Sequence, residues 1–466
     1  MSSLLPVVNG KMARELINDG DGICQVADSE RLVADAAPTK EFFIWMLGRD
    51  IELIPAIIDL VDNCLDGARR LRGDEDFQGL WVRLELNGAE FRISDNCGGI
   101  PLETAQKYAF RFGRAPGMET TPHSVGQFGV GMKRALFKLG KHFRVASATS
   151  TESFVVDVDV PEWQRKAEWE FPITEHAGPP QSDEFGTKIS VADLHSPVSE
   201  RFSRQSFLAA LADDLSRKHQ PAMGRGLAIS LNGVPLDIDV MELLESEELP
   251  VATQETTFFA DEDYPVRVKL YAGVSSSEPQ EAGWYVYCNG RLILGPDQTL
   301  VTGWGDGGEQ AVPRFHNRYA RFRGYAFFDS DDSSRLPWTT TKTGVDTNSD
   351  LYQAARQRMI TLMKPVLDFL RTIEREREDP PDDMLPLEAV VATARPVALE
   401  RVRTGVSFAR PRRVISRPKV EDQSIQYRRP IAQIERAKQV LGVGSASAVG
   451  ERSFDYFYVR ECGEEE

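Results

Sequence analysis

The chain has 466 residues, 41% of them hydrophobic, and its length predicts about two to four domains. Its formal net charge of −16 argues against a protein whose whole surface is basic and binds nucleic acid. Its five cysteines are scattered without a CxxC pair, which fits a reducing compartment and argues against a cysteine-rich zinc cluster. The N-terminus has no basic-then-apolar signal pattern and no apolar run reaches membrane-spanning length, so the expected location is cytoplasmic, with no membrane partner.

The first regular pattern of the chain is a long helix. Residues 1–38 mix Gly, Asp and Pro without a period and predict an irregular N-terminal arm, whereas apolar residues at helical spacing predict a helix within 51–68. On this helix Asp59 and Asn63 are four residues apart and share a face, and Asp66 follows one turn later. Such a face is usually a solvated surface, unless the neighbouring segments supply a ligand.

A hairpin and a glycine-containing turn follow this helix. Alternating strands around Asn87-Gly88 predict a β-hairpin over 81–94. The second strand runs into the segment DNCGGI at 95–100. By itself this segment indicates a turn. Alternatively, the Asp95 carboxylate accepts a hydrogen bond from an exocyclic amine, with the glycines leaving room for a flat ring.

A second glycine-rich turn, GQFGVG at 126–131, comes after a predicted helix at 102–110 and precedes another at 132–139. Unpaired backbone N–H groups at such a turn, together with the helix dipole, favour a bound anion. Lys133 on the first helical turn adds a cation. Strands are predicted next at 143–148, 154–160 and 185–191.

Four of these segments, in this order, resemble the GHKL ATPase superfamily of gyrase, the ninety-kilodalton heat-shock chaperone, histidine kinases and MutL-type repair proteins. They are DLVDNCLDGA (the N-box), DNCGGI (the adenine motif), GQFGVG (the lid-end phosphate turn) and FGTKISV (the Gly-Thr motif). KYAFRFGRA at 107–115 and GWYVYCNGRLIL at 283–294 resemble microrchidia (MORC) ATPases and their bacterial counterparts. The resemblance implies an α+β fold: a Bergerat-type two-layer α/β sandwich at 39–195, then a βαβ-rich, S5-like transducer domain at 196–348.

The resemblance also implies roles for individual residues. Asp59 is the expected general base, Asn63 the ligand of Mg²⁺ bridging the ATP phosphates, and Asp95 the partner of the adenine amine with help from Thr187, while Gly99 gives the ring clearance. The remaining expected nucleotide contacts are Asp66, Ile100, Gly126, Gln127, Phe128, Gly129, Val130, Gly131 and Lys133.

Two departures from the superfamily pattern affect these expectations. The base is usually Glu, so the shorter Asp59 predicts slow hydrolysis. Cys97 replaces the first glycine of the adenine motif, so the backbone there has to accept a Cβ atom.

The transducer is expected to contain a helix at 207–218 and strands at 226–234, 264–272, 284–294 and 321–329. In the superfamily this domain places a lysine on the γ-phosphate, and LPWTTTKTGVD at 336–346 is the matching segment. Lys342 is therefore the second candidate catalytic residue, with an exposed turn lysine as the alternative. A cation carried by another domain can sense a third phosphate.

The C-terminal part, expected to be helical and extended, begins with a long helix predicted at 349–378. A linker at 379–383 opens the tail that occupies 379–466. Within it, residues 401–440 contain nine Arg and two Lys against three acids, so 11 − 3 gives a local net charge of +8. This segment is suited to DNA phosphates or to an acidic partner. Short helices are predicted near 436–443 and 446–458, and we expect this C-terminal segment to bind a partner protein.

The resemblance implies a Mg²⁺-dependent ATP-binding and ATP-hydrolysing clamp that forms a homodimer on ATP and acts on DNA, in bacterial antiviral defence or in DNA repair. A chaperone-like protein remodeller and a nucleotide-gated scaffold with little hydrolysis are the alternatives. A histidine kinase is disfavoured because no dimerisation helix with a phospho-acceptor His precedes the N-box. No nuclease signature is visible.

Overall fold

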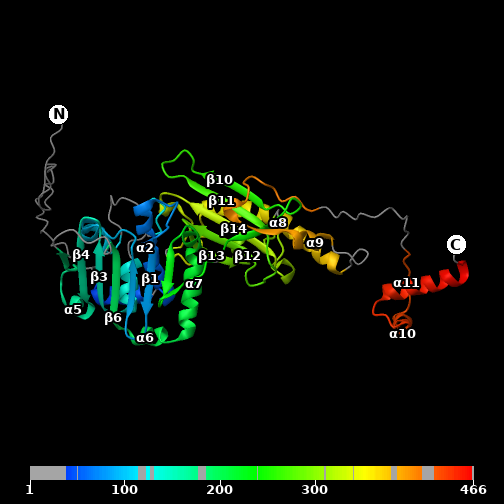
Figure 1. Ribbon diagram of the computed structural model, residues 1–466, viewed down its shortest axis with the longest axis horizontal. Coiled ribbons are helices and arrows are strands. Elements are labelled where there is room, and N and C mark those ends of the chain that lie inside the picture. The colour runs from blue at the N-terminus through cyan, green and yellow to red at the C-terminus, as the bar shows by residue number, and fades with distance from the viewer. Residues whose placement is uncertain are drawn as a thin grey trace, which may run out of the picture.

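The computed structural model describes residues 38–49, 51–113, 122–125, 131–176, 185–238, 240–308, 311–339, 341–378, 386–411 and 425–463. Two β-sheets follow one another along the long axis of the molecule, and the C-terminal helices lie beyond the second sheet (Figure 1). We call the described residues of 38–238 the first unit and those of 240–411 the second unit. The expected N-terminal arm except Pro38, residues 126–130 of the glycine turn, and the linker 379–383 lie outside the described residues.

The first unit contains an eight-stranded mixed sheet in the order β5-β4-β3-β6-β2-β1-β7-β8. Its strands are β1 (Trp81–Leu86), β2 (Phe91–Asp95), β3 (Gly140–Ala148), β4 (Ser153–Asp159), β5 (Ile173–His176), β6 (Gly186–Leu194), β7 (Ala228–Leu231) and β8 (Val234–Pro235). The predicted hairpin is confirmed by the antiparallel pairing of β1 with β2, in which Leu86 faces Phe91. Alternation of buried and exposed side chains along β1 is the period-2 pattern that the sequence carries.

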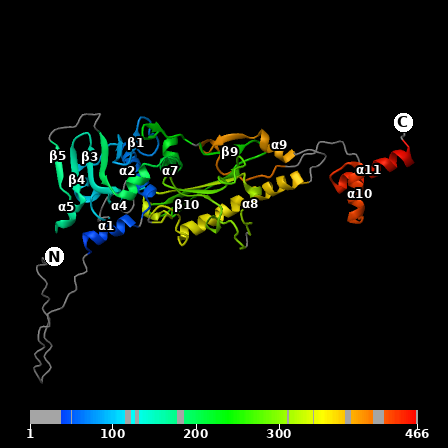
Figure 2. The same cartoon turned by 90° about the horizontal axis from the view of Figure 1, so that it is seen from below.

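The first unit also contains seven α-helices, several of which are labelled beside the sheet in Figure 2. They are α1 (Lys40–Arg49), α2 (Leu53–Arg72), α3 (Leu102–Thr104), α4 (Gly131–Leu139), α5 (Val160–Arg165), α6 (Ser196–Phe202) and α7 (Gln205–Gly224), and a short π-helix spans Ala105–Ala109. The predicted helix within 51–68 is part of α2, whose Ile57, Val61 and Leu65 are fully buried. Basic residues fill its last turn, where they oppose the negative end of the helix dipole. This mixed α/β arrangement is consistent with the expected ATPase fold.

The first sheet continues past the boundary expected at 195/196. β7 pairs with β1 in parallel, with Trp81 opposite Ala228, and β8 pairs with β7. Helix α7 provides the crossover between sequence-distant parallel strands. The first sheet therefore extends to Pro235. The pair Trp81 and Ala228 is separated by 228 − 81 = 147 positions, and a pairing between such distant segments leaves no signal in the local sequence pattern.

The second unit contains a seven-stranded sheet in the order β13-β12-β14-β11-β9-β15, with β10 paired to β11. Its strands are β9 (Glu242–Glu245), β10 (Ala252–Phe258), β11 (Val266–Val274), β12 (Gly283–Cys288), β13 (Arg291–Asp297), β14 (Phe322–Asp329) and β15 (Arg395–Ala398). The expected βαβ-rich pattern differs from this. Among the described pairings of this sheet, β12 with β14 is the parallel one, and the connection between β13 and β14 contains 3₁₀ turns at Leu300–Thr302 and Asn317–Tyr319.

A single strand expected at 284–294 is instead the hairpin of β12 and β13. Asn289 and Gly290 form its turn, with φ angles of 45° and 70°. Two consecutive left-handed residues make the tight turn whose twist matches a hairpin, and Asn-Gly is the sequence that favours it. The local signal was therefore present in the sequence.

The long helix predicted at 349–378 is confirmed as α8 (Asp350–Glu378), which packs against β11 and β14. The short helix α9 (Pro386–Thr393) and β15 then return the chain to β9, so residues expected in the tail complete the second sheet. One contiguous apolar core runs through both units. Beyond them, α10 (Ile431–Leu441) and α11 (Ala446–Phe457) pack on each other.

No helix in the described part of the chain is long and apolar enough to span a membrane.

Candidate functional site

The polar face of α2 meets cations from two other elements. Asp59 is 3% exposed, and its Oδ2 accepts a hydrogen bond from Nη2 of Arg134 at 2.8 Å. Arg134 stands on α4, directly after the glycine turn. From the second unit, Nζ of Lys342 lies 3.5 Å from Oδ1 of Asp59. The structure therefore brings together the two candidate catalytic residues, although 283 positions separate them in the chain.

Asp62, one turn further along α2, is the most heavily paired carboxylate of this face. It is completely buried, and its Oδ1 lies 2.7 Å from Nη1 of Arg291 and 3.1 Å from Nε2 of His219. Its Oδ2 accepts from Nζ of Lys342 at 3.1 Å. Burial alone raises the pKa of Asp62, but Arg291 and Lys342, with His219, outweigh burial and hold this pKa well below its usual value.

The partners of Asp62 respond to the same environment. Burial alone lowers the pKa of Lys342, yet Asp62 and Asp59 raise it above its usual value, so the ammonium stays charged inside the protein. For His219 burial is the stronger effect and lowers its pKa, against the influence of Asp62. The interface between the two units thus contains a buried group of ionised side chains.

Lys342 reaches this group from a tight turn. Trp338 and Val345 form an isolated β-bridge at its base, and the N–H of Thr339 donates to the carbonyl of Gly344 at 3.0 Å. Lys342 has a φ angle of 52°, a left-handed conformation that costs a residue with a Cβ atom about 1–2 kcal/mol. Such strain persists only where surrounding contacts fix it, and here the two carboxylates of α2 provide them.

The adenine motif is built around the buried end of β2. Oδ1 of Asp95 accepts hydrogen bonds from the N–H groups of Cys97 at 2.8 Å and Thr187 at 3.3 Å. Burial raises the pKa of Asp95, against the effect of its bonds with the Cys97 N–H and the Cys64 thiol. Thr187 and Asp95 therefore lie together, as the resemblance implied. A Cβ atom on Gly186 would lie 1.9 Å from the Asp95 carbonyl oxygen, so this glycine is required for the contact.

Cys97 fits its position without backbone strain, because the left-handed conformations fall on Gly98 and Gly99, with φ angles of 89° and 70°. A Cβ atom on Gly99 would lie 2.2 Å from the carbonyl oxygen of Ala148. Glycine at position 99 is therefore needed for close packing against β3, in addition to the space that it is expected to leave for the adenine ring. Ile100, also expected at the nucleotide, donates its N–H to Oγ of Ser147 at 2.7 Å.

Three other expected contacts differ in their surroundings. Asn63 is exposed on α2. Asp66 is buried, and its Oδ1 accepts from the N–H of Val125 at 2.8 Å, so it fixes the segment that leads into the glycine turn. Lys133 was expected as a mobile cation near the phosphates. In the structure it is 3% exposed and donates to the carbonyl of Ala109 at 2.8 Å, and burial lowers its pKa to about 7.

The glycine turn is described only at its end. Gly131 begins α4, and a Cβ atom there would lie 3.1 Å from Oδ2 of Asp59, so glycine lets the helix start against the candidate base. Gly126, Gln127, Phe128, Gly129 and Val130 lie outside the described residues.

Sequence reasoning missed four charged or titratable residues of the buried ion group at the polar face of α2: Asp62, Arg134, His219 and Arg291. Asp62 alone had a local signal, since it stands next to the buried apolar stripe of α2, where a carboxylate needs a partner. The other three come from α4, α7 and β13, which only the tertiary structure brings together.

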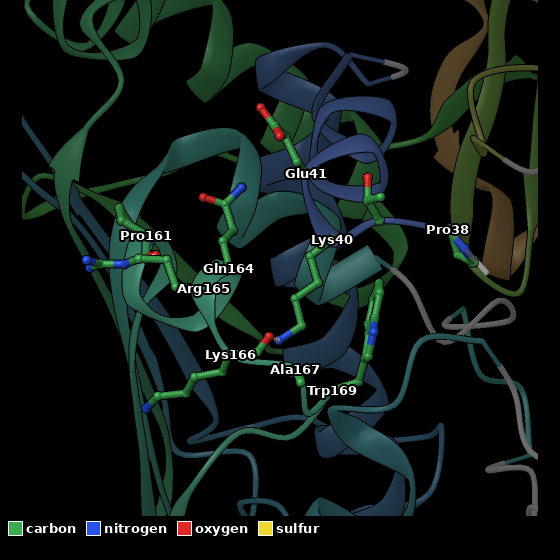
Figure 3. Close-up of a pocket in the computed structure, with 10 residues that line it drawn as sticks. Pro38, Lys40, Glu41, Pro161, Gln164, Arg165, Lys166, Ala167 and Trp169 are labelled. Atoms are coloured by element: carbon green, nitrogen blue, oxygen red, sulfur yellow. Dashed lines mark hydrogen bonds between the residues drawn. The ribbon is translucent and has the colours of Figure 1, made fainter. Parts of the chain in front are cut away.

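An open pocket of about 840 Å³ lies elsewhere, between the start of α1 and the end of α5 (Figure 3). Lys40 fills part of it, and its Nζ donates to the carbonyls of Trp163, Lys166 and Glu168 at 2.6–2.8 Å. The ammonium also lies 4.1 Å from the centroid of the Trp163 ring. Lys40 thus satisfies carbonyls at the end of α5, and the pocket contains none of the candidate nucleotide residues.

The charged residues around the polar face of α2 fit a magnesium–polyphosphate ligand. Three buried cations (Arg134, Arg291 and Lys342) face two buried carboxylates (Asp59 and Asp62), which leaves one positive charge in excess. Among the described residues, no group of three or more His, Cys, Asp or Glu side chains could hold a metal ion. The amide oxygen of Asn63 offers a single ligand, as suits Mg²⁺, which keeps water and phosphate oxygens around it.

Comparison with known proteins gives a family match for part of the chain. Residues 51–187 match the model of the family described as histidine kinase-, DNA gyrase B-, and HSP90-like ATPase, a region that contains Asp59, Asn63 and Asp95. No curated protein matches the chain. The family match supports a place for residues 51–187 in the GHKL superfamily, and with it the binding and hydrolysis of ATP.

Proposed function

We propose that the chain is a slow, Mg²⁺-dependent ATPase that works as a molecular clamp, forming a homodimer on ATP and acting on DNA. The contact of Lys342 with Asp59 carries this proposal. It joins a cation of the second unit to the expected base of the first. The position of the second unit then depends on what occupies the site on α2.

Each residue has a defined task in the proposed reaction. Asp59 holds the attacking water and accepts its proton, and Asn63 holds Mg²⁺. When bound, the metal ion neutralises phosphate charge and orients the transferred group. Asp95 and Thr187 hold the adenine amine. Slow turnover follows from the short side chain of Asp59, and its Oδ2 is held in an ion pair with Arg134, which it has to leave before it can orient a water.

Nucleotide and carboxylates compete for Lys342. A γ-phosphate offers a higher negative charge than either carboxylate alone and needs a cation on its outer side. Transfer of Lys342 to the phosphate changes the interface between the units, which is how a local charge difference becomes a domain movement.

The clamp reading includes a role on DNA. The basic stretch 401–440 supports it, and Arg403, Arg428 and Arg429 are exposed among its described residues. Residues 107–115 and 283–294 resemble segments of MORC-type ATPases. This resemblance supports a role of the protein in bacterial antiviral defence or in DNA repair. The exposed aromatic side chains of Phe454 and Phe457 on α11 support docking of a partner protein at the C-terminus.

A nucleotide-gated scaffold is the second candidate, and one observation favours it. Asp59 is paired with both Arg134 and Lys342, so its carboxylate has to leave cations before it can act as a base. In this reading ATP binding moves the second unit and hydrolysis contributes little.

The experiment compares ATP turnover of the full chain with and without duplex DNA, at low and high salt, and measures its mass with a non-hydrolysable ATP analogue. The clamp predicts turnover that DNA raises, a DNA effect that falls steeply with salt, and a dimer that forms with the analogue. Binding without turnover and without a DNA effect contradicts the clamp and supports the scaffold. Turnover raised by an unfolded protein client, and not by DNA, supports a chaperone-like remodeller.

A further inference from the structure

Arg134 of α4 is a buried cation beside the expected base. It is 9% exposed, and its Nη2 donates to Oδ2 of Asp59 at 2.8 Å. Its Nε is buried as well and has no hydrogen-bond partner in the described part of the chain. A buried donor of a charged group is costly when it has no acceptor. The Nε of Arg134 is therefore a donor that a ligand can use.

The first turn of α4 brings this guanidinium to Asp59. Gly131 is the first residue of α4 and Arg134 follows three positions later, so the two residues share a face of the helix. A Cβ atom on Gly131 would lie 3.1 Å from Oδ2 of Asp59, the same oxygen that Arg134 contacts. Side chains of a helix tilt toward its N-terminus. The guanidinium therefore lies near the N-terminal end of α4, which is the end that favours an anion.

Asp59 has a cation at each of its two carboxylate oxygens. Arg134 holds Oδ2 from the first unit, and Nζ of Lys342 lies 3.5 Å from Oδ1. Lys342 has Asp62 as a further partner at 3.1 Å, and Asp62 is also held by Arg291. Asp62 therefore stays paired when Lys342 moves, whereas Asp59 loses both of its described cations when Arg134 and Lys342 move together.

The shape of the guanidinium suits it to a phosphate better than to the contact it makes with Asp59. Nε and Nη2 form one edge of the planar group, and both donors of this edge point the same way. Asp59 accepts from Nη2, while Nε has no acceptor among the described residues. Two oxygens of one phosphate group match such an edge and can accept from both donors.

We propose that Arg134 is a phosphate-binding residue of the nucleotide site, which binds the terminal phosphate of ATP in place of Asp59. This inference rests on the proposed function, because it places that phosphate beside Asp59. Arg134 and Lys342 then bind the phosphate together, one from each unit, and Asp59 is released from both cations. ADP lacks the third phosphate and leaves Asp59 paired with Arg134. The base therefore becomes available only when ATP is bound.

Dissociation constants of ATP, ADP and adenosine, with Mg²⁺, test this inference on the full-length chain. Arg134→Gln is compared with the wild type, and the same change is made in a protein that already carries Asp59→Asn. The second comparison is decisive because Asp59→Asn removes the ion pair of Arg134. Any further effect of Arg134→Gln in that background comes from a contact with the nucleotide and not from the lost pair with Asp59.

We expect Arg134→Gln to weaken ATP binding by about tenfold or more in both backgrounds, and ADP binding by less than about threefold. Arg134→Lys keeps the charge but not the two-donor edge, so its loss of ATP affinity should be intermediate. Lys138→Gln is the matched control. Lys138 is on the same helix, donates to the carbonyl of Gly48 at 2.7 Å and loses the same charge, and its variant should bind both nucleotides within about twofold of the wild type.

Adenosine binding reports on folding, because retained affinity shows that the Asp95 region is intact. The Asp59→Asn background also protects the fold, since Arg134→Gln then leaves no carboxylate of Asp59 buried without its partner. The inference is overturned if Arg134→Gln leaves ATP affinity unchanged in the Asp59→Asn background, or if ATP and ADP lose affinity equally. A wild type that binds neither ATP nor ADP refutes the proposed function itself.

Discussion

Nζ of Lys342 lies 3.1 Å from Oδ2 of Asp62, across the boundary between the two units. The lysine turn and α2 are 280 positions apart in the chain, and both side chains are buried. Buried charges are stable only when they are paired, so this contact ties the second unit to the polar face of α2. The same face contains the expected base and the expected metal ligand.

Asp59→Asn tests the base. The amide keeps the shape of the side chain but cannot accept a proton, so we expect turnover to fall by about 100-fold or more while ATP affinity stays within about threefold of the wild type. Steady-state phosphate release and a binding titration measure the two effects. Asp59→Glu serves as the comparison that keeps a carboxylate. Unaltered turnover in Asp59→Asn would move the base to another residue.

Asn63→Ala tests the metal ligand. Because Asn63 is exposed, its truncation should change the free energy of unfolding by no more than about 0.5 kcal/mol. The variant should nevertheless lose Mg²⁺-dependent nucleotide binding. ATP is titrated in Mg²⁺ and in a chelator, and the wild type should show a difference that the variant lacks. An unchanged Mg²⁺ effect in the variant would remove the assignment of Asn63.

Asp62→Asn tests the buried ion group through stability. The change leaves Arg291 and Lys342 buried with one carboxylate fewer, and breaking such a group costs about 3–5 kcal/mol. Urea unfolding at pH 7 of the wild type and the variant measures this loss, with the exposed Asp263→Asn as the control variant. A loss as small as that of the control would show that the group contributes nothing to stability.

The same pair of proteins has a predicted pH dependence. The pKa of Asp62 is held well below its usual value in the folded state, whereas in the unfolded chain it is about 3.9. Its contribution is therefore fully present above about pH 4 and is lost progressively as the pH falls toward the folded pKa. The stability difference between wild type and Asp62→Asn should be constant from pH 7 to 5 and shrink below about pH 4. A difference that grows on acidification would contradict the lowered pKa.

Much of the fold follows from local patterns. The period of α2, the alternation of β1 and the charged length of α8 each appear within a few turns of sequence, and the structure contains all three elements. The identity of the strand that pairs with a given edge of a sheet has no such local sequence signal. β7 joins β1 only because α7 returns the chain to that edge, so the first sheet continues past the boundary expected at 195/196.

The site divides in the same way. The spacing of Asp59 and Asn63 on one helix is a local property, and the structure keeps both on the polar face of α2. Arg134 and Arg291 come from elements that no local rule places beside Asp59 or Asp62. The turn at Asn289-Gly290 had a local signal, yet the hydrogen bond from Asn289 to the carbonyl of Ser124 depends on how the two units pack.

The central claim is that a cation of the second unit takes part in the ATP reaction on α2, and Lys342→Ala tests it most directly. Phosphate release is measured in a single turnover at saturating ATP and Mg²⁺, together with ATP affinity. Loss of a charge aimed at the transferred phosphate should slow the reaction by about 100-fold, with ADP affinity within about threefold of the wild type. A variant that releases phosphate at the wild-type rate would contradict the account.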